Sequence, residues 1–232
     1  MKITRKQTVL AISVGVLCVL VGYGVWLALP RLFNPYAGMK TTLEVQMDDA
    51  TRMLVQQRLA TAQSSIAASQ KAGEKTDMNS YLVIAENQHM LGDLIASREA
   101  YETYLELNPI SYVAWNAYAS LLETMGDIEN AGVAYQRAIS ELRTEEEYYR
   151  DYAEYLAANY PEHEDWYKQV LDDAFENIGQ TPWTMIALGD WFFAHNDCQL
   201  GHDHYSVAKT LSPDNENIVT DAKEKYAACT AK

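Results

Sequence analysis

The sequence contains few residues of the kinds that mark several classes of protein. Three cysteines among 232 residues are too few for a small domain held together by disulfides. Six prolines and eleven glycines are too few for a low-complexity chain, and a hydrophobic content of 48% is too high for a disordered one. The chain therefore has enough apolar residues for one well-packed domain with an additional segment.

Basic residues are also scarce. Lys and Arg total 18 against 32 for Asp and Glu, which gives a formal net charge of −14. The excess of acid begins after residue 40, because residues 1–40 contain five basic residues and no acidic one. A body of this charge repels phosphate backbones, so the composition excludes non-specific binding of nucleic acid.

Sequence motifs of catalysis are missing. The chain contains no Gly-rich phosphate loop and no GxSxG, HExxH or CxxCH motif. The acidic cluster Glu145–Glu147 is interpreted as the charged start of a helix that Thr144 caps, and not as a pair of catalytic carboxylates. We therefore expect a protein that is not an enzyme and that needs no cofactor.

One long hydrophobic run, Val9–Leu29, carries no charge. As a helix it would span roughly 30 Å, the thickness of the hydrocarbon core of a bilayer. A cleaved signal peptide has a shorter apolar core and a small-x-small cleavage site, so residues 9–29 are predicted to form an uncleaved transmembrane signal anchor. Because Lys2, Arg5 and Lys6 precede the run, the N-terminus is expected in the cytoplasm and the rest outside it. The predicted localisation is a single-pass membrane protein with a periplasmic or cell-surface domain.

Residues 30–41 contain two prolines and a glycine and are predicted to be a linker. Residues 42–73 are predicted to form one long amphipathic helix, because their apolar residues recur at helical spacing without proline or glycine. The pattern Thr41-x-x-Glu44 resembles a capping box at its start, and Gly73 is a typical C-terminal stop.

From residue 78 onward the chain repeats itself with a period of 34 residues. This register places Tyr81 above Trp115 and Ala85 above Ala119, and a Gly-Asp pair recurs at Gly92 and at Gly126. Small residues at such positions allow two helices to approach closely, and large residues elsewhere in the unit fill the space between neighbouring pairs.

The period and the pattern resemble the tetratricopeptide repeat (TPR), a helix-turn-helix unit. The clearest unit is residues 182–215, which carries Leu188, Gly189, Phe192, Gly201, Tyr205, Ala208 and Pro213 at the motif positions. The resemblance implies about four repeats over residues 78–213, the third of them degenerate, and a capping helix within 214–232. The predicted fold is all-α, a TPR solenoid preceded by one transmembrane helix and without a β-sheet.

In the TPR family the first helix of each pair lines a groove that holds peptides. The family's groove positions fall here on Asn79, Leu82, Glu86, His89, Asn116, Ser120, Glu123, Arg150, Glu154, Trp183, Ile186, Asp190 and Phe193. The Lys and Asn pair with which some members hold a C-terminal carboxylate is missing at these positions. An acidic groove with an aromatic end favours a basic or mixed apolar peptide as partner.

The resemblance also implies a disulfide between Cys198 and Cys229. In such an array the second helix of the last repeat runs antiparallel to the helix that follows, and the two arms have nearly equal length. The two cysteines should therefore meet at the same end, whereas Cys18 lies in the predicted membrane helix. Free buried thiols and metal ligation remain the alternatives.

Three functions follow as hypotheses. The first is a membrane-anchored adaptor or scaffold that binds partner proteins outside the cytoplasm during assembly of an envelope complex. The second is an accessory protein of cytochrome c maturation that presents apocytochrome to a haem lyase. The third is a metal-binding protein built on His195, Cys198, His202 and His204, although residues 202 and 204 would lie about 200° apart on a helix.

Overall fold

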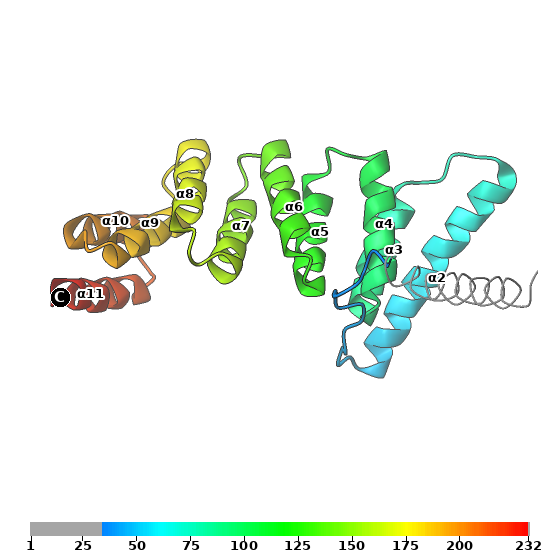
Figure 1. Ribbon diagram of the computed structural model, residues 1–232, viewed down its shortest axis with the longest axis horizontal. Helices are drawn as coiled ribbons and strands as arrows, with labels where there is room; N and C mark the ends of the chain where they lie inside the picture. The colour runs from blue at the N-terminus through cyan, green and yellow to red at the C-terminus, as the bar shows by residue number, and fades with distance from the viewer. Residues whose placement is uncertain (1–33, 232) are drawn as a thin grey trace, which may run out of the picture. The chain divides into compact units, whose positions relative to one another are not determined.

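The computed structural model describes residues 34–231. The chain divides into two compact units, Met1–Thr41 and Thr42–Lys232. Of the first unit, residues 34–41 are described, and they begin with a turn in which the amide of Ala37 donates to the carbonyl of Asn34 (3.1 Å). The second unit contains every helix within the described residues (Figure 1).

Ten α-helices follow one another in the second unit, and within the described residues the only β-type pairing is one isolated bridge. The helices are α2 (Asp49–Ala72), α3 (Asn79–Leu91), α4 (Leu94–Leu107), α5 (Tyr112–Met125), α6 (Ile128–Glu141), α7 (Glu146–Asn159), α8 (Glu164–Ile178), α9 (Pro182–Ala194), α10 (Cys198–Leu211) and α11 (Asn217–Thr230). Each helix packs against the next one along the chain, and α11 also contacts α9. The arrangement is a helical solenoid of the predicted class.

Local signals explain why the helices begin and end where they do. Gly92 and Gly126 end α3 and α5 in the left-handed conformation, each with a φ of 83°, which favours glycine. Asp93 then caps α4, because its side chain accepts a hydrogen bond from the amide of Ala96 (3.0 Å). Turns of this kind join α3 to α4 and α5 to α6, whereas α7 is capped by Tyr160 and α9 by His195 without a left-handed glycine. The chain is thus divided into four pairs of helices: α3 with α4, α5 with α6, α7 with α8, and α9 with α10.

The core lies between the helices and combines small residues with large aromatic ones. Ala85, Ala119 and Ala153 are buried where a first helix meets its neighbours, and Tyr101 and Tyr135 are buried on second helices. The small side chains allow close approach, and the tyrosine rings fill the remaining space.

The long helix α2 begins later than the sequence predicted. Residues 42–48 are not helical, because the amide of Leu43 donates to the carbonyl of Gly92 (2.9 Å) and Thr42 forms an antiparallel bridge with Asp93. The helix is capped instead by Asp48, whose side chain accepts a hydrogen bond from the amide of Thr51 (2.9 Å). The predicted capping box at Thr41 and Glu44 is therefore wrong, since a contact distant in sequence holds this segment in an extended conformation.

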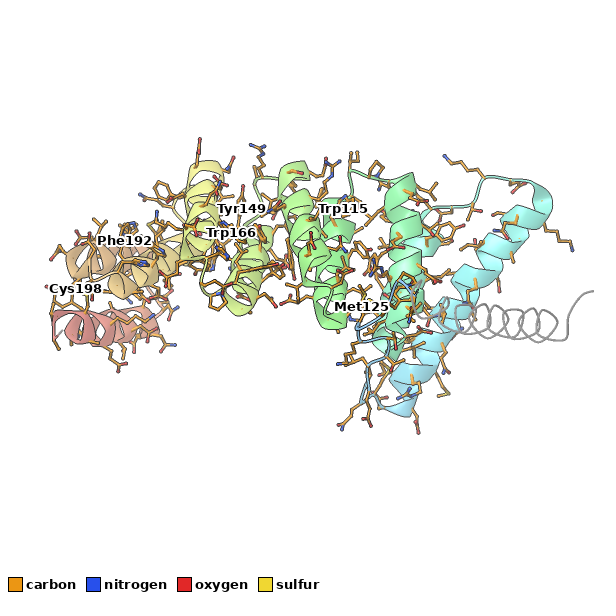
Figure 2. The ribbon with its side chains drawn as sticks, in the orientation of Figure 1. Trp115, Met125, Tyr149, Trp166, Phe192 and Cys198 are labelled. Carbon is orange, nitrogen blue, oxygen red and sulfur yellow. A yellow bond between two sulfur atoms is a disulfide. The ribbon has the colours of Figure 1, made fainter. Side chains whose placement is uncertain are left out.

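The last helix is tied to the array by a disulfide. Cys198, at the start of α10, is bonded to Cys229 near the end of α11, and their Cα atoms lie 5.7 Å apart. Figure 2 shows Cys198 beside α11. The two cysteines that the TPR resemblance pairs are thus joined in the structure.

The predicted localisation is contradicted. The predicted span, residues 9–29, lies outside the described residues, and no helix within residues 34–231 is long and apolar enough to cross a membrane. The structure therefore does not support a single-pass membrane protein.

Candidate functional site

The residues predicted to line a groove lie on the first helix of each pair. The structure places Asn79, Leu82, Glu86 and His89 on α3, Asn116, Ser120 and Glu123 on α5, Arg150 and Glu154 on α7, and Trp183, Ile186, Asp190 and Phe193 on α9. All of them except Phe193 are partly or fully exposed. We call this set without Phe193 the A-helix face.

Contacts across the helices join much of the A-helix face into one surface. The side-chain amide of Asn116 on α5 donates to Asp151 Oδ2 on α7 (2.6 Å), and that of Asn159 on α7 donates to Glu123 Oε1 on α5 (3.0 Å). The guanidinium carbon of Arg150 on α7 lies 5.8 Å from the ring centroid of Trp183 on α9, within the range of a cation–π contact. The structure therefore joins the predicted residues of α5 to α7 through Asp151 and Asn159, and it brings the predicted residues Arg150 and Trp183 together.

At the C-terminal end of this face an acidic residue already holds a lysine. Asp190 on α9 pairs with Lys225 of α11 and accepts a hydrogen bond from the hydroxyl of Tyr205 (2.6 Å). Burial raises the pKa of Tyr205, and the neighbouring Asp190 raises it further, so the hydroxyl remains a hydrogen-bond donor to the carboxylate. A carboxylate at this groove position can thus bind an ammonium group.

At the N-terminal end the A-helix face borders a cavity of about 650 Å³ between α2 and α3, lined in part by Asn79 and Glu86. Burial raises the pKa of Glu86 and lowers that of His89. Asn87, 5% exposed, also lines this cavity, and its Nδ2 donates to the carbonyl of Val83 (2.6 Å). Its Oδ1 atom has no hydrogen-bond partner among the described residues. This end of the face is therefore hollow and contains an unpaired acceptor.

Phe193 does not belong to this surface. Its side chain is 6% exposed, its ring centroid lies 5.8 Å from that of Tyr205, and a Cβ at Gly201 would lie 2.7 Å from the ring. The prediction that Phe193 contacts a peptide is therefore wrong, because the ring fills the space where α9 and α10 approach each other. Replacing it would disturb the core and would not report on binding.

The histidines proposed as metal ligands do not come together with Cys198. The sulfur of Cys198 is used in the disulfide. The ring of His195 stacks on Trp191, with centroids 3.8 Å apart, and its Nε2 lies 2.9 Å from Glu164 Oε2. Within residues 34–231 no group of three or more His, Cys, Asp or Glu side chains is placed to hold a metal ion. The structure does not support the metal-binding alternative.

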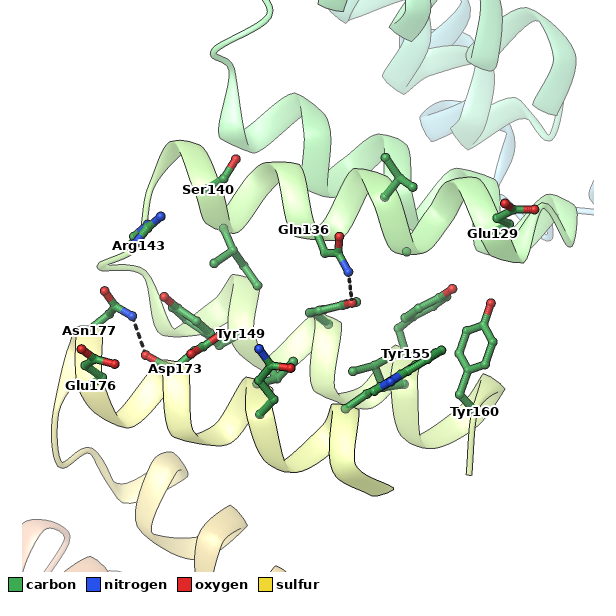
Figure 3. A pocket seen from close by; sticks show the side chains of 18 residues that line it. Glu129, Gln136, Ser140, Arg143, Tyr149, Tyr155, Tyr160, Asp173, Glu176 and Asn177 are labelled. Atoms are coloured by element: carbon green, nitrogen blue, oxygen red, sulfur yellow. Dashed lines mark hydrogen bonds between the residues drawn. The ribbon is translucent and has the colours of Figure 1, made fainter. Parts of the chain in front are cut away.

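A second hollow was missed by the sequence analysis. Helices α6 and α8 both pack on α7, and between them lies a cavity of about 650 Å³ with Tyr149, Tyr152 and Tyr155 of α7 among its lining residues (Figure 3). We call it the outer cleft. Residues 148–160 contain five tyrosines. This concentration of aromatic residues is the sequence signal that could have revealed the cleft.

These contacts define the class of protein. Paired helices packed in chain order, with a surface formed by the first helix of each pair, make the chain a TPR-like helical repeat protein. Residues 67–184, half of the chain, match the family model described as the PRP39 N-terminal HAT repeat. The chain therefore belongs to this repeat family. No curated protein matches it.

Several solved structures are similar in fold. YrrB, described as a TPR protein with an unusual peptide-binding site, is 14% identical with a TM-score of 0.52, over 72% of this chain and 84% of that one. MamA is 13% identical with a TM-score of 0.53, over 65% and 81% of the two chains. The pilF protein of Pseudomonas aeruginosa is 12% identical with a TM-score of 0.51, over 78% and 87%. Repeat proteins of this kind are generally scaffolds for protein–protein interaction and not enzymes.

Proposed function

We propose that the A-helix face binds an extended segment of a partner protein, so that the chain acts as a scaffold in the assembly of a protein complex. The observation that carries this proposal is the continuity of the surface from α5 to α9, through the hydrogen bond from Asn116 to Asp151 and the contact of Arg150, next to Asp151 in α7, with Trp183. Trp183 and Ile186, both partly exposed, supply apolar contact area next to polar groups. Aromatic residues in such positions commonly contribute most of the binding energy.

The charge of the A-helix face supports a basic or mixed apolar partner. Glu86 and Glu154 are exposed acids on the face, and Asp190 already pairs with Lys225 of the same chain. Lysine or arginine side chains of a partner could form the same kind of pair. YrrB, which shares the fold, is described as having a peptide-binding site. No contact among residues 34–231 favours the cytochrome c maturation hypothesis, so it is not proposed.

Selection of peptides tests this proposal. A phage-displayed library of random 12-residue peptides is selected on the full chain, and the affinities of the recovered peptides are measured by fluorescence anisotropy. We expect peptides enriched in Lys, Arg and apolar residues. Trp183→Ala should weaken their binding about tenfold or more, because it removes a central aromatic contact.

Phe175→Ala is the matched control, because Phe175 is an aromatic residue on α8, 40% exposed, that lines neither the A-helix face nor the outer cleft. It should leave the affinity of these peptides unchanged, and circular dichroism should show that both variants keep their helices. Equal binding by the Trp183→Ala variant, or an equal loss in the Phe175→Ala variant, would contradict the placement of the site on the A-helix face.

A further inference from the structure

The outer cleft lies between two helices that do not belong to the A-helix face. On α6 its lining residues recur every three or four positions, from Glu129 to Ser140, with Arg143 just after the helix, and on α8 they run from Trp166 to Asn177. This spacing places each set on one side of its helix. The two sides face each other across α7, as Figure 3 shows, so the cleft is an elongated hollow with an aromatic floor.

Aromatic rings gather at one end of the outer cleft. The ring centroid of Tyr160 lies 5.9 Å from that of Tyr155 and 5.4 Å from that of Trp166. Trp166 is 43% exposed, and His163 stacks on it with centroids 4.0 Å apart. Tyr155 is 2% exposed, so the rings that a cation can reach are those of Tyr160, which is partly exposed, and Trp166. Tryptophan and tyrosine are the preferred partners in such contacts.

Hydrogen bonds fix the tyrosines of the floor in place. The hydroxyl of Tyr155 donates to the carbonyl of Ile128 (2.5 Å), and Gln136 Nε2 donates to the hydroxyl of Tyr152 (2.5 Å). A Cβ at Gly132 would lie 2.9 Å from the Tyr155 hydroxyl, so glycine leaves room for this ring beside α6. The aromatic end is therefore preorganised, which lowers the entropic cost of binding.

The carboxylate of Glu129 lies at the aromatic end of the outer cleft. Glu129, exposed at the start of α6, lines the cleft, and Figure 3 shows it at the end that holds Tyr155 and Tyr160, with Arg143 and Asn177 at the other end. A cation over the rings would therefore also be attracted by a negative charge. The basic group Arg143 lies at the other end, where Asp173 and Glu176 also line the cleft (Figure 3), so it does not compete for the cation at the aromatic end.

We propose that the outer cleft is a second protein-binding site, which takes an extended segment of a partner with an arginine or lysine side chain seated on the rings of Tyr160 and Trp166, at the end of the cleft that holds Glu129. The α6 residues that line the cleft run from Glu129 to Ser140, which corresponds to roughly 17 Å along the helix, and an extended segment of about five to six residues covers that length. Side-chain amides along the cleft, such as that of Gln136, can bond to its backbone.

The test follows tryptophan signals by fluorine NMR. The full chain is labelled with 5-fluorotryptophan, and the Trp166 signal is assigned from its loss in Trp166→Phe. The probes are two acetylated and amidated hexapeptides of alanine and serine, one with a central arginine and the other with the uncharged isostere citrulline. The arginine peptide should shift the Trp166 signal in a saturable manner and bind about tenfold more tightly than the citrulline peptide.

Variants of the lining residues locate the cation. Glu129→Gln should raise the dissociation constant of the arginine peptide by about fivefold or more, whereas Glu106→Gln, which removes an exposed acid on α4, should not change it. Tyr160→Phe, which keeps the ring, should bind normally, and Tyr160→Leu should bind weakly.

The same spectra separate this proposal from binding at the A-helix face, because Trp183 reports on that face. Equal binding of the two hexapeptides, an unshifted Trp166 signal, or equal effects of Glu129→Gln and Glu106→Gln would each overturn the outer-cleft proposal. A shift of the Trp183 signal alone would also overturn the outer-cleft proposal, and it would place the binding of the peptide on the A-helix face. A shift of Trp166 alone would support the outer cleft whatever the peptide selection finds.

Discussion

At the scale of single residues, two glycines with the same backbone conformation have different surroundings. Gly92 and Gly126 both have a φ of 83° at the end of a first helix. A Cβ at Gly92 would lie 2.0 Å from the carbonyl oxygen of Leu43, whereas a Cβ at Gly126 would meet no atom within 4 Å. Gly92 is therefore required both for its φ and for the close approach of the extended segment before α2.

We predict that Gly92→Ala destabilises the protein more than Gly126→Ala. The left-handed conformation costs either alanine about 1–2 kcal/mol, and at Gly92 the added methyl group must also displace Leu43. The free energy of unfolding is measured with urea for the two variants and the unmodified chain. The difference between each variant and the unmodified chain gives the destabilisation caused by that substitution. Equal losses would show that the contact between Leu43 and Gly92 adds nothing to stability.

At the scale of elements, the last helix is held by several kinds of contact. Helix α11 packs on α10 and α9, Ile218 and Cys229 are buried, and Lys225 reaches Asp190 of α9. The disulfide fixes the C-terminal end of α11, and Lys225 joins its middle to the A-helix face. A terminal helix of a solenoid has a neighbour on one side only, so a covalent bond there restrains the element that most readily frays.

We predict that Cys229→Ser lowers the free energy of unfolding by about 3–4 kcal/mol, the entropic contribution of a disulfide that closes a loop of this size. The sequence separation of the two cysteines is 31. Cys18→Ser is the matched control and should leave stability unchanged. A tryptic digest under non-reducing conditions should contain the peptides of Cys198 and Cys229 as one species, and their separate appearance would contradict the bond.

At the scale of the whole molecule, stability is divided among neighbouring helices. The helices pack on their neighbours along the chain, and the one additional packed pair within the described residues is α9 with α11. In such an array a local change weakens the nearest interfaces and leaves distant ones intact. The two proposed binding surfaces share α7 but use different residues of it, and their tryptophans, Trp183 on α9 and Trp166 on α8, lie on different helices, so they can be tested separately.

We predict that Gly189→Ala affects one end of the array. A Cβ at Gly189 would lie 2.6 Å from the ring of Tyr205, so α9 and α10 must move apart. Hydrogen exchange should become faster in α9, α10 and α11 and remain unchanged in α3 and α4. A uniform increase over all helices would show instead that the protein opens only as a single cooperative unit.

The sequence by itself determined the repeat architecture. A period of 34 residues, a Gly-Asp pair in each of the first two units and alternating small and aromatic positions are local properties, and they predict helix pairs because each depends on residues close together in the chain. The repeat register also assigned most residues of the A-helix face to the correct helices. These features required no knowledge of how distant segments meet.

Only the tertiary structure decided the remaining features. Helix α2 begins at Asp49 because Leu43 bonds to the distant Gly92, and Phe193 is buried because Gly201 of α10 leaves space for its ring. The outer cleft exists because α6 and α8 both pack against α7 and leave space between them. Each of these depends on side chains far apart in sequence, and a periodic pattern contains no information about which of them come into contact.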